Sequence, residues 1–386
     1  MRKVTLVVFE GGRPLSEAED LVVSVRKAVV LDNLNKFTGL PELDRVLLYT
    51  TYEDLASKAA RIGTKIEVEL VPARGQFRFG EHIVKVVKEH ALEAVLYMGG
   101  ASGSLLAAGE VAAVARGLAA ADALVVANNV FSSDIVGFTP AGTVLGLSGD
   151  LPASDNALAM SLARVLPVAS MDETVGALFD VDTPTDVMVL GLHPDVGPCA
   201  RAAIGNLDLE PAWGRLLQAR DTLSSYLSEI ALIGRVNPSA VGYVNRHLKC
   251  RTRVFSEERG MKALGRQHRK EVVSLIGCLI EQVGFAAFVT ALGKVADAAF
   301  MDSRVLFQHL GLMLSARDRF SSDLMRPADI QNRAAGAFTR SVLDAAIPVV
   351  LGGHCLVSGG LRALVDSAVR RQKTGNGLVL RQDSLL

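Results

Sequence analysis

The chain has 386 residues, of which 49% are hydrophobic, 21% charged and 5% aromatic. That apolar content excludes a disordered chain, and the length is sufficient for two domains. Because 41 Lys and Arg residues balance 41 Asp and Glu residues, overall basicity gives no argument for a nucleic-acid or acidic-lipid partner.

The first half of the sequence alternates short apolar runs with helical periodicity. The expected strands cover residues 4–9, 45–50, 66–71, 94–98, 123–127, 167–169 and 187–190. The expected helices cover residues 16–37, 52–61, 80–90, 107–119 and 154–165. This alternation predicts a three-layer α/β domain with a mostly parallel sheet over residues 1–197.

After residue 194 the apolar spacing becomes helical and stays helical. Helices are expected at residues 212–233, 240–247, 269–300, 305–315, 328–345 and 361–371, with one strand-like run at 347–351. We therefore expect an all-α helical domain over residues 198–373, which can also serve as a homo-oligomer contact. A flexible tail is expected over residues 374–386.

One segment resembles a membrane span by length. Residues 272–292 contain only two strongly polar side chains, Glu281 and Gln282. Polar groups at mid-span are costly in hydrocarbon, and no second candidate exists, so we favour a buried helix pair and expect no membrane partner.

The four cysteines and the amino terminus bear on the compartment. Cys199, Cys250, Cys278 and Cys355 lie far apart without a Cys-x-x-Cys pair, which argues against a disulfide framework and a Cys-rich zinc site. The first residues lack the long apolar run and the cleavage site of a signal peptide. We expect a cytoplasmic protein.

The balanced net charge hides two oppositely charged halves. Residues 1–200 hold 16 basic and 25 acidic side chains, whereas residues 201–386 hold 25 basic and 16 acidic ones. Residues 246–270 alone hold nine Lys or Arg. This stretch can be a solvated helix face, a surface that docks onto the acidic half, or a contact for a phosphorylated ligand. It contains one aromatic residue, Phe255, so we expect no nucleic-acid partner.

The loop after the first expected strand can approach a phosphate. Gly11 and Gly12 let backbone N–H groups come close to an anion, and Arg13 adds positive charge. The loop contains neither a Walker motif nor a Rossmann fingerprint. A simple chain-reversing turn is the alternative.

Two further segments carry candidate contacts. Residues 99–106 (GGASGSLL) follow an expected strand, where ligands of parallel sheets bind, so Gly99, Gly100 and Ser102 are candidate nucleotide contacts. In residues 180–186 (DVDTPTD), alternation places Asp180 and Asp182 on one side of an extended segment, as a hard cation requires. Asp186 also suits the first turn of a helix.

Together with residues 128–134 (NNVFSSD), these motifs resemble the molybdopterin-cofactor guanylyltransferase and 2-phospholactate guanylyltransferase group of nucleotidyltransferases, over residues 1–195. The resemblance implies that a nucleoside triphosphate binds with Mg²⁺ and that its nucleoside monophosphate passes to a small phosphorylated acceptor. It implies catalytic roles for Arg13 and Asp182, with Asp182 holding the metal. Gly11, Gly12 and Arg13 would hold the phosphates, and the loop with Arg74 and Gly80 would contact base and ribose.

The middle loop departs from the family pattern. Where the family has Gly-Asp-x-Pro-Leu, this chain has Ala101 and no carboxylate. Metal-dependent transfer relies on cation charge, so the loss of a ligand matters. Asp134 or Glu10 can supply the oxygen, and Asn128 and Asn129 are further candidates. Otherwise the domain binds a nucleotide without transferring it, or it is a glycosyltransferase that uses a nucleotide-sugar.

A last candidate lies in the second half. Residues 352–360 (GGHCLVSGG) separate a strand-like run from a helix, a context that can bind an anion through His354 and Ser358. A tight packing turn is the alternative. Adjacent residues on an extended chain face opposite ways, which argues against a catalytic pair of His354 and Cys355.

Overall fold

The structure is a computed structural model that describes residues 2–72, 77–147, 151–262 and 264–375. The chain forms two compact units. Unit 1 comprises Met1–Asp182 and Val196–Leu207, and unit 2 comprises Thr183–Asp195 and Asp208–Leu386. The boundary expected at residue 197 falls within this exchange of segments, and most of the expected tail, residues 376–386, lies outside the described residues.

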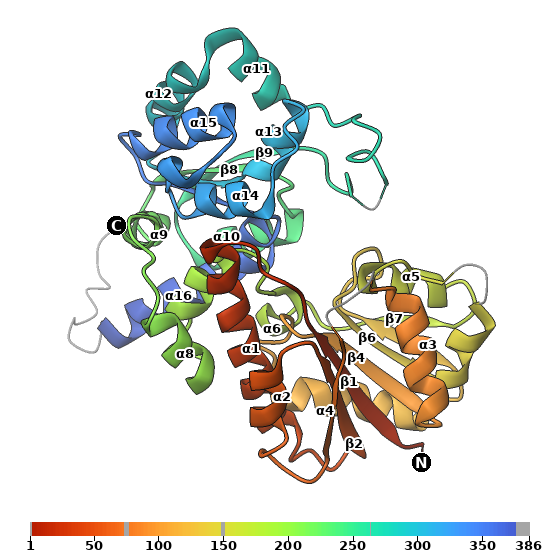
Figure 1. The fold of residues 1–386 in the computed structure, drawn as a ribbon. Coiled ribbons are helices and arrows are strands. Elements are labelled where there is room, and N and C mark those ends of the chain that lie inside the picture. Colours follow the sequence, from red (N-terminus) through yellow and green to blue (C-terminus); the bar gives the residue numbers. More distant parts are fainter. Residues whose placement is uncertain (1, 73–76, 148–150, 263, 376–386) are drawn as a thin grey trace. The chain divides into compact units, whose positions relative to one another are not determined.

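Unit 1 is built on a seven-stranded sheet with the order β3-β2-β1-β4-β6-β5-β7 (Figure 1). Only β6 runs antiparallel to its neighbours, so the prediction of a mostly parallel sheet is confirmed. The strands are β1 (Val4–Glu10), β2 (Arg45–Thr50), β3 (Ile66–Leu70), β4 (Ala94–Gly99), β5 (Leu124–Ala127), β6 (Ile135–Thr139) and β7 (Val168–Ser170). Strand β6 was not predicted, because its run IVGFT is short and interrupted by Gly137.

Helices cover both faces of this sheet, which gives the predicted three layers. On one face lie α1 (Glu17–Phe37), α2 (Glu53–Ala59) and α4 (Ala108–Ala120). On the other lie α3 (Phe79–Glu89) and α5 (Leu158–Leu162). A short helix, α6 (Val175–Leu178), follows β7. Both faces of the sheet are buried, and its central strands are therefore almost continuously apolar.

Helix α8 (Pro198–Gly205) also belongs to unit 1. Its first turn is capped by the Asp32 carboxylate of α1, which accepts hydrogen bonds from the backbone N–H groups of Cys199 at 3.0 Å and Ala200 at 2.8 Å. A carboxylate at a helix amino terminus is favourable because it meets unpaired N–H groups.

Unit 2 is rich in helices, but they surround a four-stranded parallel sheet with the order β11-β10-β8-β9. This finding corrects the all-helical expectation. The strands are β8 (Glu229–Gly234), β9 (Arg251–Ser256), β10 (Ala298–Asp302) and β11 (Val349–Gly352). Strands β8 and β10 are short apolar runs that directly continue the apolar pattern of preceding helices. Periodicity cannot distinguish such buried strands from buried helices.

The helices of unit 2 include the segment expected as a strand at residues 187–190. It is the middle of α7 (Pro184–Leu192), where Thr183 and Asp186 form a capping box. The remaining helices are α9 (Ala212–Leu223), α10 (Pro238–His247), α11 (Leu275–Val283), α12 (Phe285–Val295), α13 (Ser303–His309), α14 (Ala316–Asp323), α15 (Arg333–Leu343) and α16 (Gly359–Gly375).

The membrane-span candidate of the sequence is the pair α11 and α12. Among the described residues no single helix is long and apolar enough to cross a membrane; this pair, bent by 119°, passes by length and composition only. The predicted helix pair is thus present, but it is buried on one side only. Ile280 and Phe288 are buried, whereas Leu275 and Leu279 are exposed.

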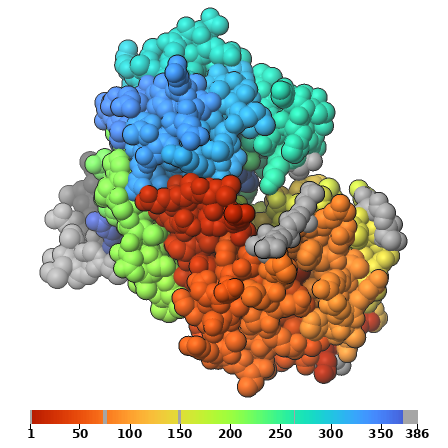
Figure 2. Space-filling model, in the orientation of Figure 1, coloured from red at the N-terminus to blue at the C-terminus, as the bar shows by residue number. Residues whose placement is uncertain are grey.

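The basic stretch 246–270 begins in α10 and continues beyond β9, and its part after β9 lies at the surface of unit 2, in teal in Figure 2. Several of its side chains pair locally. Arg251 and Arg253 contact Glu229, and Arg266 contacts Glu258 at 2.8 Å. Local pairing of exposed charges supports the interpretation of a solvated surface.

Candidate functional site

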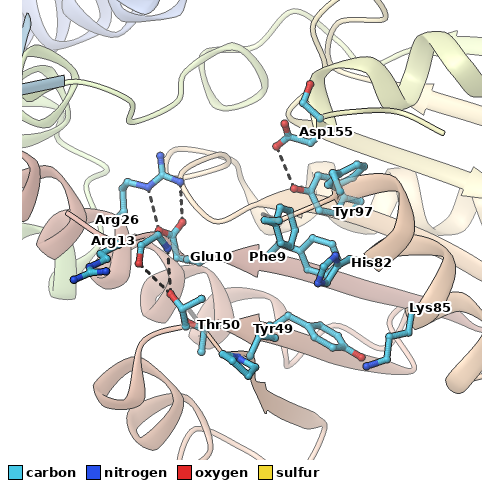
Figure 3. Close-up of a pocket in the computed structure, with 18 of the residues that line it drawn as sticks. Phe9, Glu10, Arg13, Arg26, Tyr49, Thr50, His82, Lys85, Tyr97 and Asp155 are labelled. Atoms are coloured by element: carbon cyan, nitrogen blue, oxygen red, sulfur yellow. Dashed lines mark hydrogen bonds and ion pairs between the residues drawn. The ribbon is translucent and has the colours of Figure 1, made fainter. Parts of the chain in front are cut away.

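A cavity of about 740 Å³ lies at the carboxyl ends of β1, β2 and β3 in unit 1 (Figure 3). The chain places β2 and β3 on one side of β1 and β4 on the other. In open α/β sheets, ligands bind outside the carboxyl ends of strands at such a reversal of strand order. The volume also lies in the range of small-molecule pockets.

One wall of the cavity is aromatic. The ring centroid of Phe9 lies 5.4 Å from that of Tyr49 and 5.5 Å from that of Tyr97, in edge-to-face geometry. The rings of Phe77 and His82 lie 4.4 Å apart, and Phe77 is 54% exposed. These rings come from β1, β2, β4, α3 and the segment before α3, and together they offer faces on which a planar ring can stack.

Tyr97 also brings a carboxylate to the cavity. Its hydroxyl donates a hydrogen bond of 3.1 Å to Oδ2 of Asp155. Burial, together with the Asp155 carboxylate, raises the pKa of Tyr97 well above its usual value, so the phenol stays protonated. Asp155 Oδ2 lies 3.5 Å from the position that a Cβ on Gly99 would take. A carboxylate is therefore present beside the middle loop, although its own sequence lacks one.

Glu10 and Arg26 form a buried ion pair at the opposite end of the cavity. Alternation along β1 directs Phe9 toward α3 and Glu10 toward α1, which carries Arg26. Arg26 donates from Nε to Oε1 at 3.1 Å and from Nη2 to Oε2 at 2.9 Å, and the Glu10 side chain is only 1% exposed. Arg26 Nη1 also lies 3.4 Å from Oδ1 of Asp182.

The charge state of this pair follows from its surroundings. Burial alone would lower the pKa of Arg26, but the carboxylate of Glu10, helped by that of Asp182, raises it. The guanidinium is therefore a permanent cation held by two carboxylates. Bidentate pairing of this kind fixes its orientation.

Three of the predicted nucleotide contacts are not in the cavity lining. A Cβ on Gly100 would overlap the side chain of Glu10, so this glycine makes room for Glu10. The Ser102 hydroxyl donates to the carbonyl of Gly99 at 2.7 Å, and Ser102 is buried. The middle loop thus packs against the residues of the cavity wall, and direct nucleotide contact by Gly99, Gly100 and Ser102 stays a prediction.

The first loop does line the cavity, through Gly11, Gly12 and Arg13. The N–H of Gly12 donates to Oγ1 of Thr51 at 3.1 Å. Arg13 is exposed and forms no hydrogen bond or ion pair with any described residue, so its charge is available to a ligand. Figure 3 shows Arg13 on the side of Glu10, away from the aromatic wall.

Two of the predicted nucleotide contacts, Arg74 and Gly80, lie before α3 and in its first turn. Arg74 lies outside the described residues. Gly80 packs beneath residues 151–152, because a Cβ there would lie 2.7 Å from Cβ of Leu151 and 2.8 Å from the carbonyl of Pro152. Gly80 is a packing residue, and its neighbours Phe77, Phe79 and His82 reach the cavity instead.

The two predicted metal ligands, Asp134 and Asp182, have different polar partners. Oδ1 of Asp134 accepts a hydrogen bond from Nδ2 of Asn156 at 2.9 Å, whereas Asp182 is 62% exposed beside Arg26. Among the described residues, the sets of three or more His, Cys, Asp or Glu side chains with ligand atoms within 4.8 Å of one another comprise only Cys278, Glu281 and His309, in unit 2. A guanidinium lies beside the Asp182 carboxylate, and the role of Asp182 as a metal ligand stays a prediction.

The two asparagine candidates, Asn128 and Asn129, accept hydrogen bonds within their own loop. Asn128 Oδ1 accepts hydrogen bonds of 3.1 Å from the N–H groups of Asp134 and Ile135, and Asn129 Oδ1 accepts one from Phe131. Such contacts shape the loop between β5 and β6. His354 and Ser358 belong to unit 2.

Sequence reasoning missed the aromatic wall, Arg26, Asp155 and Lys85, which also lines the cavity. Arg26, Lys85 and Asp155 lie in segments that have no motif of their own, and the loop with Arg74 and Gly80 was singled out for these two residues and not for its aromatic ones. The alternation along β1 is the one available signal, because it places an aromatic ring and a carboxylate on opposite sides of one strand end.

No protein-family model matches the sequence, and a comparison with curated proteins finds no match. Among solved structures, a protein from Desulfovibrio desulfuricans G20 assigned as a nucleotide-diphospho-sugar transferase is 16% identical, with 54% of this chain and 100% of that chain covered and a TM-score of 0.37. A cytidylyltransferase from Leptospira borgpetersenii is 11% identical, with 54% and 99% covered and a TM-score of 0.38. These values are too low to decide a family or an activity.

Proposed function

We propose that unit 1 binds a nucleoside triphosphate in the cavity at the carboxyl ends of β1 to β3. The observation that carries this proposal is that one cavity has an aromatic end and a positively charged end. Aromatic rings stand at one end, and the Gly11–Gly12–Arg13 loop with Arg26 stands at the other. A base stacks on aromatic faces, and phosphates favour backbone N–H groups and guanidinium groups.

The reaction class that we propose is nucleotidyl transfer to a small phosphorylated acceptor, with release of pyrophosphate. Arg13 would neutralise phosphate charge, and Arg26, held by Glu10 and Asp182, would supply a fixed positive charge near them. No step is assigned to a metal, because the Arg26 guanidinium lies beside the Asp182 carboxylate.

A second candidate function is nucleotide binding without transfer. It is favoured by the position of Arg26, whose guanidinium lies between the carboxylates of Glu10 and Asp182. A guanidinium neutralises charge but cannot activate an acceptor oxygen as a metal ion does.

Calorimetric titration with each of the four triphosphates, in Mg²⁺ and in EDTA, tests binding. We expect one triphosphate to bind with similar affinity in both buffers. Pyrophosphate release with phosphorylated acceptors then separates the two functions. Binding without release supports the second, and binding of none of the four refutes both. Release of a nucleoside diphosphate from a nucleotide-sugar would instead indicate a glycosyltransferase.

Phe77→Ala is expected to weaken triphosphate binding about 5- to 150-fold, because base stacking on an aromatic ring contributes about 1–3 kcal/mol. Fold stability should change little, since Phe77 is 54% exposed. The matched control is Phe131→Ala, which removes a ring that is 73% exposed and does not line the cavity. Equal affinities of the two variants in calorimetry would remove Phe77 from the base-binding wall.

A further inference from the structure

The sheet of unit 2 has its own reversal of strand order. Strand β8 is followed in the chain by β9, which pairs with one side of β8, and then by β10, which pairs with the other side. Ligands of open parallel sheets bind outside the carboxyl ends of the strands at such a reversal. The residues that end β8 and β10 therefore lie where a ligand of this sheet would bind.

A buried ion pair joins these two strand ends. Arg235, directly after β8, donates from Nε to Oδ2 of Asp302 at 2.5 Å and from Nη2 to Oδ1 at 3.2 Å. The Asp302 side chain is 0% exposed and that of Arg235 is 15% exposed. Gly234 allows this approach, because its φ is +104° and a Cβ would lie 2.7 Å from Cβ of Asp302.

A second pair lies next to the first. Arg304, in the first turn of α13, donates from Nη1 and Nη2 to the two carboxylate oxygens of Asp323, at 2.7 and 2.6 Å. Its backbone N–H also donates to Oδ1 of Asp302 at 3.2 Å. All four carboxylate oxygens of Asp302 and Asp323 therefore accept hydrogen bonds within the cluster.

The guanidinium groups, in contrast, retain donors. Arg235 Nη1 and Arg304 Nε form no hydrogen bond with any described residue, and both side chains are partly exposed, at 15% and 12%. Two buried ion pairs add little to fold stability, because the cost of removing their charges from water offsets the attraction between them. A cluster of buried charges at a sheet edge is therefore a candidate for a functional site.

His354 lies at the same edge of the sheet, after β11, and is exposed. Burial would raise the pKa of Asp302, but Arg235, with smaller contributions from His354 and Arg304, holds it below its usual value. Ser358 is not available as a donor here, because its hydroxyl donates to the carbonyl of His354 at 2.8 Å.

We propose that the carboxyl edge of the unit 2 sheet binds a phosphate group through Arg235 and Arg304, with His354 at its rim. Asp302 and Asp323 orient the two guanidinium groups, and the N–H groups that remain, Arg235 Nη1 and Arg304 Nε, would donate to the phosphate oxygens. The ligand class is a small phosphorylated molecule. This inference does not depend on the nucleotide site of unit 1.

Equilibrium dialysis of the full chain against radiolabelled inorganic phosphate tests the proposal. The double variant Arg235→Gln/Asp302→Asn replaces the ion pair by two amides of similar shape, and we expect phosphate binding at least about tenfold weaker. Arg235→Lys keeps the positive charge but loses the planar guanidinium, and it should weaken phosphate binding similarly. It replaces the double variant as the test if the double variant does not fold. Unchanged binding in the folded variants would overturn the proposal.

Two controls separate this site from others. Arg246→Gln removes an exposed charge on α10 and should leave phosphate binding unchanged. Arg116→Gln removes an exposed cation of unit 1 that does not line its cavity and should also leave phosphate binding unchanged. Loss of phosphate binding in Arg116→Gln, or equal binding of acetate as a carboxylate probe, would contradict the assignment.

Discussion

Arg26→Gln is expected to destabilise unit 1 by about 3–5 kcal/mol, because removal of one partner leaves a buried charge unpaired. That charge belongs to Glu10, whose side chain is 1% exposed. Thermal or urea unfolding measures the loss. The matched control is Arg116→Gln, since Arg116 on α4 pairs with Glu42 but is 59% exposed, and this change should cost less than about 1 kcal/mol. Equal effects of the two substitutions would show that the Glu10 pair is not a buried ion pair.

The double variant Arg26→Gln/Glu10→Gln separates fold from binding. With both charges gone, no buried charge is left unpaired, so most of the stability should return. Triphosphate affinity should stay reduced by about tenfold or more, because the fixed cation is missing. Full recovery of affinity in calorimetry would show that Arg26 has a structural role only.

The parts of the fold that could be predicted are those where local signals agree. Strands β1, β2 and β4 are uninterrupted apolar runs, and α1 begins after Ser16, whose hydroxyl accepts from the N–H of Glu19. Strands β8 and β10 were predicted as helices, because their apolar runs, EIALIG and AAFMD, merge with helical patterns on either side. Their identity as strands depends on pairing with each other, which is a non-local contact.

The candidate site was predicted only at the first loop. Gly11, Gly12 and Arg13 line the cavity as expected, since a glycine pair at the end of a strand is a local signal. The partner of Glu10 could not be predicted, because Arg26 is one of several charged residues on α1 and only the fold decides which one faces β1. The hydrogen bond between Tyr97 and Asp155 could not be predicted either, because the two residues are 58 positions apart in the sequence.

The DVDTPTD motif shows how one sequence signal can serve two purposes. Asp182 remains at the surface beside Arg26, whereas Thr183 and Asp186 are buried and cap α7. Thr185 donates to the carbonyl of Leu351 at 2.6 Å, which fixes the first turn of α7 against β11. The second half of the motif is therefore explained by helix capping, which leaves Asp180 and Asp182 as its candidates for ligand chemistry.

Arg304→Met is expected to destabilise unit 2 by about 3–5 kcal/mol, because the Asp323 side chain is 0% exposed and would lose both hydrogen bonds. Burial raises the pKa of Asp323 even beside Arg304, so the orphaned carboxyl should protonate and recover part of this loss. For a unit of this size the cost corresponds to a fall of roughly 6–20 °C in the unfolding midpoint, measurable by calorimetry.

Two further variants decide whether the buried charge causes this effect. Arg304→Met/Asp323→Leu removes both charges and should restore most of the stability, since well-packed apolar residues replace buried ion pairs at little cost. Arg326→Met breaks a pair with Asp208, which is 79% exposed, and should shift the midpoint only slightly. If the double variant were as unstable as Arg304→Met, lost packing around the Arg304 side chain would account for the effect, and the buried ion pair would not.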